Sequence, residues 1–381
     1  MTRSSTAAAA PGTGVPSPAS VTVTIVNYNG AAFLDDCLDA VLALQGEVDE
    51  IIVVDNASTD DSRERVAARG SSVRLVALPT NDGPCPARNR GLLEAKTPWV
   101  LQLDSDVIVR PDTLVVLLAE CRPGVAIVQP RAVLADDPSV VHYDGGRMHY
   151  VGVMCLDHLL ARPDAPPGPP EDVDAVISMA LLVDRRVVLE AGAYDEAFFI
   201  LFEDHDLSYR LRARGHRLRR VPGASVLHRE GTRGISYRPG TQSYPSRRAY
   251  LHARNRAYLV IKNYSWPALL LSWPGRCVYA LVWAVFAATR GVLLDYLRGR
   301  LDLLRLVPRA LRERRRLAGA RRVGDGRLLG SDDLTFSPVI TRKPFEAGLE
   351  GVLNGILRGW WRLVRPLLPR GAVSAPEEDP A

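Results

Sequence analysis

The stretch that decides the fold is Trp99-Val100-Leu101-Gln102-Leu103-Asp104-Ser105-Asp106, an apolar run that ends in two carboxylates. A short apolar run of this kind is typical of a strand that is buried on both faces of a parallel sheet. Two carboxylates at the end of such a strand suit a divalent cation, which in turn holds a diphosphate. An Asp-x-Asp by itself is more often a solvated turn, so the prediction depends on its place after a buried strand.

The same pattern of strand, turn and helix recurs on the N-terminal side of this stretch. β-rich runs at 21–26, 50–54 and 73–77 alternate with helical stretches around 32–44 and 58–68. This alternation predicts an α/β fold with a mostly parallel sheet and helices on both faces. Ligands of such sheets bind at the carboxyl ends of the strands, where this chain places polar residues. Those residues are Asn27, Asn29 and Asp55, although an aspartate at this place also suits a helix cap.

A third polar cluster, Glu203-Asp204-His205-Asp206, opens a predicted helix. Asp206 has a simple explanation, because it can pair with Arg210 four residues further on. The two preceding acids lack such an explanation, and crowded carboxylates raise one another's pKa, which suits a proton acceptor. His228 follows a short strand-like run and could complete a metal shell, although a lone histidine is more often structural.

The chain changes character after Lys262. The apolar segment 266–297 is interrupted by prolines and arginines, and the longest charge-free run in its second half is 13 residues. A spanning helix needs roughly 17 to 25 residues, so we expect helices that lie in the membrane interface. A plain helical bundle against the catalytic domain is the alternative. The pair Trp360-Trp361, among arginines, also suits an interface.

The basic surplus of the chain lies in its C-terminal part. Residues 298–370 carry 17 Lys and Arg against 7 Asp and Glu, whereas the whole chain has a net charge of +5. No nucleic-acid motif accompanies this charge, so we expect an anionic membrane surface as the partner and no nucleic acid. The five cysteines are scattered without a Cys-x-x-Cys pair, which fits a reducing compartment.

Composition divides the chain into four parts. We expect a disordered tail at 1–20, which lacks the apolar core of a signal peptide, and a second tail at 371–381. Between them lie the α/β domain at 21–262 and an amphipathic, basic helical region at 263–370. Residues 131–174 look irregular and are expected to form substrate-specific loops.

These motifs, in this order, resemble glycosyltransferase family 2, the inverting GT-A enzymes, and especially its bacterial rhamnosyltransferase-like branch. The resemblance covers roughly residues 21–262. It rests on residues 23–29, 53–60, 81–83 with 87–89, 103–106, 192–196, and 202–207 with Arg210.

The resemblance implies a donor site on the strand ends. Asp55 would bind the nucleotide base, with Asn27 and Asn29 in the same pocket. Arg88 would face the diphosphate, and Asp104 would reach the ribose or the metal.

The resemblance also implies a metal and a base. Asp106 would be the main ligand of Mg²⁺ or Mn²⁺, helped by Asp104 and, as in some members, by His228. Asp204, with Glu203 beside it, would deprotonate the acceptor hydroxyl.

The expected reaction is inverting transfer of one sugar from a nucleotide-diphosphate donor to a saccharide or lipid-linked hydroxyl in cell-envelope glycan synthesis. The donor would be dTDP-rhamnose or a UDP-sugar, with GDP-mannose as a rival, and the Gln-x-x-Arg-Trp motif of processive synthases is missing. The expected location is cytoplasmic, peripheral on the inner face of the plasma membrane. A catalytically silent, nucleotide-sugar-binding scaffold in a glycan-assembly complex is the alternative; a nucleotidyltransferase should show a Gly-rich phosphate loop, which is absent.

Overall fold

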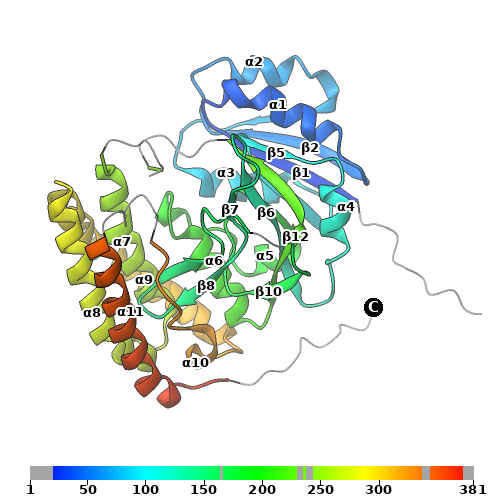
Figure 1. The fold of residues 1–381 in the computed structure, drawn as a ribbon. Helices are drawn as coiled ribbons and strands as arrows, with labels where there is room; N and C mark the ends of the chain where they lie inside the picture. Colours follow the sequence, from blue (N-terminus) through cyan, green and yellow to red (C-terminus); the bar gives the residue numbers. More distant parts are fainter. Residues whose placement is uncertain (1–19, 164–165, 230–234, 237–242, 337–343, 372–381) are drawn as a thin grey trace, which may run out of the picture.

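The computed structural model describes residues 20–163, 166–229, 235–236, 243–336 and 344–371, with the side chains of 344–347 left out (Figure 1). The two predicted tails lie almost wholly outside the described residues. The described residues form an α/β body, which carries helices α1 and α2 at one end and a layer of long C-terminal helices on one side (Figure 1).

One large sheet forms the centre of the α/β body. Its main path runs in the order β10 (Glu171–Val173), β12 (Arg217–His228), β6 (Val125–Leu134), β11 (Ala180–Asp184), β4 (Trp99–Asp104), β1 (Val21–Asn27), β2 (Val48–Asp55) and β3 (Arg74–Ala77). Two short strands leave this path: β5 (Val107–Val109) pairs with β12, and β7 (Val141–Tyr143) pairs with β6.

The predicted parallel arrangement holds for the N-terminal half of the sheet. Strands β3, β2, β1 and β4 are all parallel, and β6 is parallel to β12. In between, β11 is antiparallel to both β4 and β6, so the sheet as a whole is mixed. An apolar run predicts a buried strand but does not give its direction, which depends on the route of the chain between strands.

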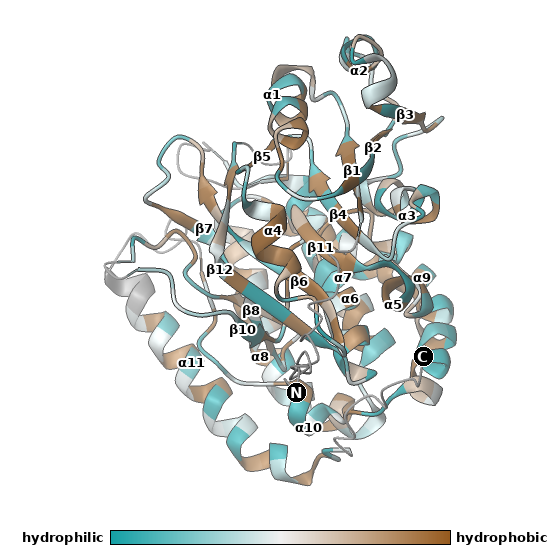
Figure 2. Ribbon diagram, turned by 90° about the vertical axis from the view of Figure 1, so that its right-hand side faces the viewer, coloured by the Kyte–Doolittle hydropathy of each residue, from teal (hydrophilic) through white to brown (hydrophobic). Residues whose placement is uncertain are grey.

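Helices cover both faces of the sheet, as expected for this fold class. One face packs against α1 (Ala31–Leu42), α2 (Ser62–Ala67) and α4 (Thr113–Leu118). The other packs against α3 (Pro84–Glu94), α5 (Arg185–Glu190) and α6 (Glu203–Ala213). Side chains alternate along a strand, and in β4 this sends Leu101 and Leu103 to the first core and Val100 to the second. The strands appear as mostly hydrophobic ribbons between the helices (Figure 2).

The stretch 131–174 is more regular than predicted. It completes β6, adds β7 and β10 to the sheet, and forms a small antiparallel pair, β8 (Gly146–His149) with β9 (Val153–Leu156). These strands are only three or four residues long, which is too short for a clear alternation of apolar and polar side chains.

The C-terminal helices are α7 (Ser246–Asn263), α8 (Trp266–Thr289), α9 (Leu293–Ala320), α10 (Asp325–Leu328) and α11 (Pro344–Val364). Helices α7 and α9 pack closely because Gly299 lacks a side chain: a Cβ there would lie 2.2 Å from the carbonyl oxygen of Tyr250. The predicted domain boundary at 262 falls at the end of α7.

A buried aromatic pair joins α11 to the β8–β9 region. The ring of Trp361 stacks on Tyr150 with centroids 4.4 Å apart, and the Tyr150 hydroxyl donates to the carbonyl of Leu357 at 3.0 Å. The predicted interfacial role is therefore wrong for Trp361, which is 1% exposed. A tryptophan that packs a helix onto its neighbours looks the same in sequence as one that faces lipid.

Helix α8 is continuous, although Pro274 lies inside it. Pro274 cannot donate to the carbonyl four residues before it, which is that of Leu270. The neighbouring carbonyls take side-chain donors: Arg276 donates to that of Leu269 at 2.7 Å, and the indole of Trp360 donates to that of Leu271 at 2.8 Å. Among the described residues, α8 is the one helix whose length and composition would allow it to cross a membrane, and 17% of its most apolar window is buried.

Candidate active site

The strand ends bring the predicted donor residues side by side. In the sheet register, Asn27 at the end of β1 lies opposite Asp55 at the end of β2, and Val26 lies opposite Asp104 at the end of β4. Parallel neighbours end at the same edge, so the polar residues that follow three apolar strands converge there. The strand ends therefore lie together at one edge of the sheet, and the roles of these residues in donor binding stay a prediction.

Asp55 is a buried carboxylate with several hydrogen-bond donors around it. It accepts from the Asn27 amide at 3.0 Å, from the backbone N–H of Ser58 at 3.0 Å and from Arg63 at 2.6 Å. Burial alone would raise its pKa, but hydrogen bonds from Ser58, Arg63 and Asn27 outweigh burial and hold the pKa of Asp55 below its usual value. Asn29 contacts the loop that follows β2, since its side-chain oxygen accepts from the Thr59 N–H at 2.8 Å.

Arg88 connects the donor edge to the acids of α6. It is 5% exposed, and one of its terminal nitrogens contacts both carboxylate oxygens of Asp104, at 2.8 and 3.2 Å. Its other terminal nitrogen lies 3.5 Å from the Glu203 carboxylate. Burial raises the pKa of Asp104 to about 6, although Arg88 acts in the opposite direction.

Asp106 and His228, the two other predicted metal ligands, lie next to each other. The register of β5 and β12 places His228 opposite Val107, next to Asp106, and the His228 Nε2 lies 3.3 Å from an Asp106 carboxylate oxygen. Two such atoms at this separation fit neighbouring ligands of one cation. The residues described hold no cluster of three His, Cys, Asp or Glu side chains that suits a metal, and the carboxylate of Asp104 is engaged by Arg88. A cation would therefore fill its shell from substrate phosphates and water, as Mg²⁺ commonly does.

The catalytic acids predicted on α6 lie in different surroundings. Glu203 is buried, and burial together with the nearby Asp204 raises its pKa to about 8 against the effect of Arg88. Asp204 is half-buried and accepts from the backbone N–H of Ser178 at 3.2 Å. Burial also raises the pKa of Asp204, despite Arg88 and Ser178. A reachable carboxylate with a raised pKa suits a general base.

Sequence reasoning missed two residues of β7 that reach this site. The Nδ1 atoms of His142 and His228 are 2.9 Å apart, so His142 orients the ring of the predicted metal ligand. Tyr143, the next residue, is 5% exposed, and burial together with the charges of Asp204, Asp104 and Asp106 raises the pKa of its hydroxyl. No motif surrounds these residues, and their strand is only three residues long.

Known proteins with similar sequences share this part of the chain. Residues 22–150 match the family model described as Glycosyl transferase family 2. The pre-mycofactocin glycosyltransferase of Mycobacterium tuberculosis strain H37Rv is 30% identical over 353 residues, which are 91% of this chain and 66% of the relative. This chain therefore spans slightly less than two thirds of that relative. The poly-beta-1,6-N-acetyl-D-glucosamine synthase of Staphylococcus aureus strain COL is 25% identical over 206 residues, 53% of this chain and 48% of the relative.

A solved mannosyltransferase from Pyrobaculum calidifontis, in complex with GDP-Man and Mn²⁺, covers 93% of this chain and 90% of its own at 16% identity and a TM-score of 0.47. This likeness adds nothing to the fold already described. The residues that the family model matches contain the strand-end acids and Arg88, whereas the acids of α6 lie beyond them. On this evidence residues 22–150 of the chain form part of a glycosyltransferase family 2 domain, and a relative over 91% of the chain is a glycosyltransferase.

Proposed function

We propose that the chain is an inverting glycosyltransferase, which moves one sugar from a nucleoside diphosphate to an acceptor hydroxyl. The observation that carries this proposal is the contact of Arg88 with both Asp104, at the donor edge, and Glu203, which precedes Asp204 on α6. A single displacement needs a donor-holding acid on one side of the transferred sugar and a base on the other. The two groups of acids meet this need around one guanidinium.

The reaction follows from these positions. Asp204 takes the proton of the acceptor hydroxyl while the acceptor oxygen forms a bond to the anomeric carbon. The bond from that carbon to the diphosphate oxygen breaks, and the nucleoside diphosphate leaves from the opposite face, so the anomeric configuration inverts. Mg²⁺ or Mn²⁺ held by Asp106 and His228 would supply positive charge to the departing diphosphate. Arg88 supplies a second, fixed positive charge near the donor edge.

The donor is tested by binding. Purified protein is titrated with dTDP-rhamnose, UDP-sugars and GDP-mannose, each with Mn²⁺ and with a chelator. All three are needed because Asp55 would contact features that uracil and thymine share. We expect metal-dependent binding of one donor, which Asp106→Ala abolishes. The absence of binding to all three kinds of donor in the presence of Mn²⁺ would contradict the proposal, whereas binding of a donor without any transfer would favour the nucleotide-sugar-binding scaffold.

The base is tested separately. Asp204→Asn should keep donor binding and lose transfer, because its amide cannot take the proton. Turnover close to that of the unmodified protein would remove Asp204 from this role while leaving the donor site intact.

We also propose that the C-terminal helices lie on the cytoplasmic face of the membrane and that the acceptor is a lipid-linked saccharide. Large apolar side chains are exposed along three helices at helical spacing, which is typical of an amphipathic surface. They are Trp266, Leu270, Trp273, Leu281 and Val285 in α8, Leu294, Leu297, Leu301 and Leu304 in α9, and Leu349, Val352, Ile356 and Leu363 in α11. Figure 2 shows hydrophobic and hydrophilic residues alternating along α11.

Positive charge adjoins the apolar stripe of α11. Arg327, Arg362, Arg365 and Arg370 line a cavity of about 440 Å³ at the C-terminal end of this helix. Guanidinium groups beside exposed apolar side chains complement anionic lipid headgroups over acyl chains.

Vesicle sedimentation tests this surface. The protein should bind vesicles that contain phosphatidylglycerol more strongly than pure phosphatidylcholine vesicles, and Ile356→Asp should weaken binding. The matched control is Leu93→Asp, since Leu93 is also exposed but lies on α3. Equal binding of the vesicles by both variants would contradict the proposed surface. A carbonate wash of cell membranes is the second test: if the protein stays in the washed membranes, α8 spans the bilayer instead.

A further inference from the structure

Helix α7 carries a row of buried polar side chains that no catalytic motif explains. Asn255, Tyr258 and Lys262 are spaced three and four residues apart and so lie on one side of the helix. The first two are completely buried, and Lys262 is 3% exposed. Polar groups so deeply buried need hydrogen-bond partners. All three find them in residues 195–206, the segment that leads into the catalytic helix α6.

Asn255 holds the loop that precedes the catalytic acids. Its amide nitrogen lies 2.9 Å from the carbonyl oxygens of Phe198 and Ile200 and 2.8 Å from that of Leu201. Next to it, Arg254 donates to the carbonyl of Phe198 at 2.9 Å. Helix α7 therefore satisfies backbone acceptors of a loop that begins at the end of the short 3-10 helix η2 (Glu196–Phe198) and runs to the start of α6.

This loop has an unfavourable backbone. Phe199, Leu201 and Phe202 have φ values of 65°, 71° and 74°, in the left-handed region that residues other than glycine rarely adopt. Such conformations persist only where surrounding contacts enforce them, and they concentrate at functional sites. Phe202 directly precedes Glu203, so the contacts that enforce the loop also decide how the first turn of α6 begins.

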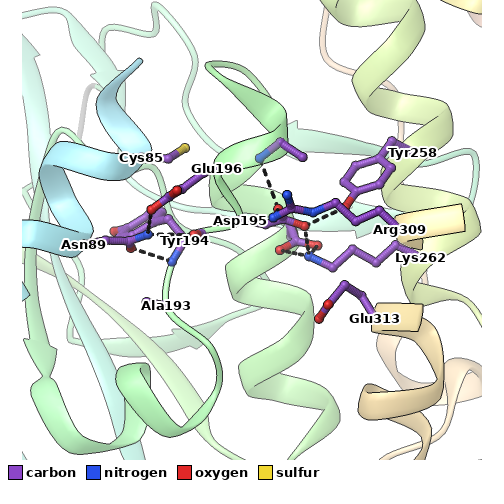
Figure 3. A network of polar contacts seen from close by, with 12 residues as sticks. Cys85, Asn89, Ala193, Tyr194, Asp195, Glu196, Tyr258, Lys262, Arg309 and Glu313 are labelled. Carbon is purple, nitrogen blue, oxygen red and sulfur yellow. Dashed lines mark hydrogen bonds and ion pairs between the residues drawn. The ribbon is translucent and has the colours of Figure 1, made fainter. Parts of the chain in front are cut away.

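Lys262 ties the two ends of the segment together. Its ammonium group lies 2.7 Å from the carboxylate of Asp195, before the loop, and 2.9 Å from that of Asp206, two residues beyond Asp204. Tyr258 donates to Asp195 at 2.8 Å, and Arg309 of α9 reaches the same carboxylate at 2.7 Å (Figure 3).

The opposite side of the segment is held by α3. Asn89 accepts from the N–H of Tyr194 at 2.9 Å and donates to Glu196 at 3.0 Å (Figure 3).

Asp195, between these two residues, stays charged. Burial alone would raise the pKa of Asp195, but Lys262, Tyr258 and Arg309 outweigh burial and hold this pKa well below its usual range. Asp195 is thus a charged anchor between the donor-side helix α3 and the C-terminal helices.

We propose that Asn255, Tyr258 and Lys262 are positioning residues, which aim Asp204 at the acceptor by holding residues 195–206 from α7. The inference rests on the proposed function, because it requires Asp204 to be the base. It assigns a role in turnover to the C-terminal helices, beyond any contact with lipid. Since the three side chains do not reach the reacting atoms, their loss should lower kcat and leave donor binding intact.

The test is Lys262→Met, which keeps most of the aliphatic stem and removes the charge. We measure kcat and KM for release of nucleoside diphosphate from whichever of UDP-glucose, GDP-mannose or dTDP-rhamnose the unmodified protein turns over. Calorimetric titration with the matching nucleoside diphosphate and Mn²⁺ gives the affinity for the nucleotide. It also gives the fraction of molecules able to bind the nucleotide, which we call competent. We expect kcat per competent molecule to fall by at least about tenfold, because the base is no longer correctly placed. The affinity for the nucleoside diphosphate should change by less than about twofold, because the three side chains do not contact it.

Arg256→Met is the matched control on the same helix. Arg256 is also a buried cation, but it donates to the carbonyl of Val151, away from the catalytic segment. The control should keep its kcat per competent molecule even if it is less stable. Equal loss of kcat in both variants would overturn the proposal and indicate general helix packing, as would unchanged kcat in Lys262→Met.

Tyr258→Phe keeps the proposal testable if Lys262→Met does not fold. It removes one hydroxyl from Asp195 and should lower kcat by about threefold to tenfold, the range of one lost hydrogen bond. In that case unchanged kcat in Tyr258→Phe would overturn the proposal. Asp204→Asn, assayed alongside, separates the two ideas: if it stays active, the proposed base is wrong whatever α7 does.

Discussion

Glu203 makes the stability of the protein depend on pH in an unusual direction. Its side chain is 5% exposed, and burial with the neighbouring charge of Asp204 raises its pKa from 4.5 to about 8. In the unfolded chain a glutamate titrates with a pKa of about 4.3. Between these two values the folded protein holds a proton that the unfolded chain has released. The free energy of unfolding must therefore fall as pH rises through this window.

The size of the effect follows from the shift. Each pH unit inside the window lowers the free energy of unfolding by about 1.4 kcal/mol, which gives on the order of 4 kcal/mol between pH 5 and pH 8. Glu203→Gln keeps the shape of the side chain and cannot ionise. Relative to the unmodified protein, this variant should gain stability by that amount as pH rises from 5 to 8.

Urea denaturation at pH 5, 6, 7 and 8 measures the difference. The control is Glu190→Gln, because the Glu190 side chain is 62% exposed and pairs with Arg186 on the surface. Its stability should run parallel to that of the unmodified protein. Asp204→Asn should flatten the dependence, since removal of the neighbouring charge lowers the pKa of Glu203. If Glu203→Gln also runs parallel to the unmodified protein, Glu203 ionises normally and the reasoning is refuted.

Three further predictions concern other parts of the chain. Trp361→Ala should lower the free energy of unfolding, measured in urea, by about 3 to 5 kcal/mol. Trp273→Ala, at a side chain that is 61% exposed, should change this free energy by less than about 0.5 kcal/mol. Equal losses in the two variants would contradict the packing of α11. Arg88→Met should raise the pKa of Asp104 above about 6. Binding of a nucleoside diphosphate with Mn²⁺, measured by calorimetry, should therefore weaken most strongly below pH 7. An unchanged affinity at pH 6 would show that the ion pair of Arg88 with Asp104 is dispensable. His228→Ala should weaken binding of Mn²⁺, followed by the electron paramagnetic resonance signal of the free ion, by about tenfold or more; an unchanged affinity would remove it from the metal shell.

The donor edge could be predicted from the sequence because its physics is local. Apolar runs followed by Asn27, Asp55 and Asp104 give strands with polar ends, and parallel pairing then brings those ends together. The acids of α6 could also be predicted, since two crowded carboxylates at the start of a helix have no structural explanation of their own.

The remaining parts of the site depend on contacts between distant segments. His142 contacts His228 from a three-residue strand, which is too short to show a pattern in the sequence. Lys262 looks in sequence like an ordinary helix residue, and only the docking of α7 places it against Asp195 and Asp206. The burial of Trp361 likewise depends on Tyr150, more than two hundred residues away along the chain.

The hold of α7 on the loop before α6 has a consequence for exchanging parts between relatives. A recombinant joint at the end of the sheet, before Ser246, would separate the loop around Phe198 from Asn255 and Lys262. A joint after Asn263 would leave those contacts within one parent. Grafted helices could then be varied to change the acceptor surface, provided that α9 keeps Arg309, which also contacts Asp195.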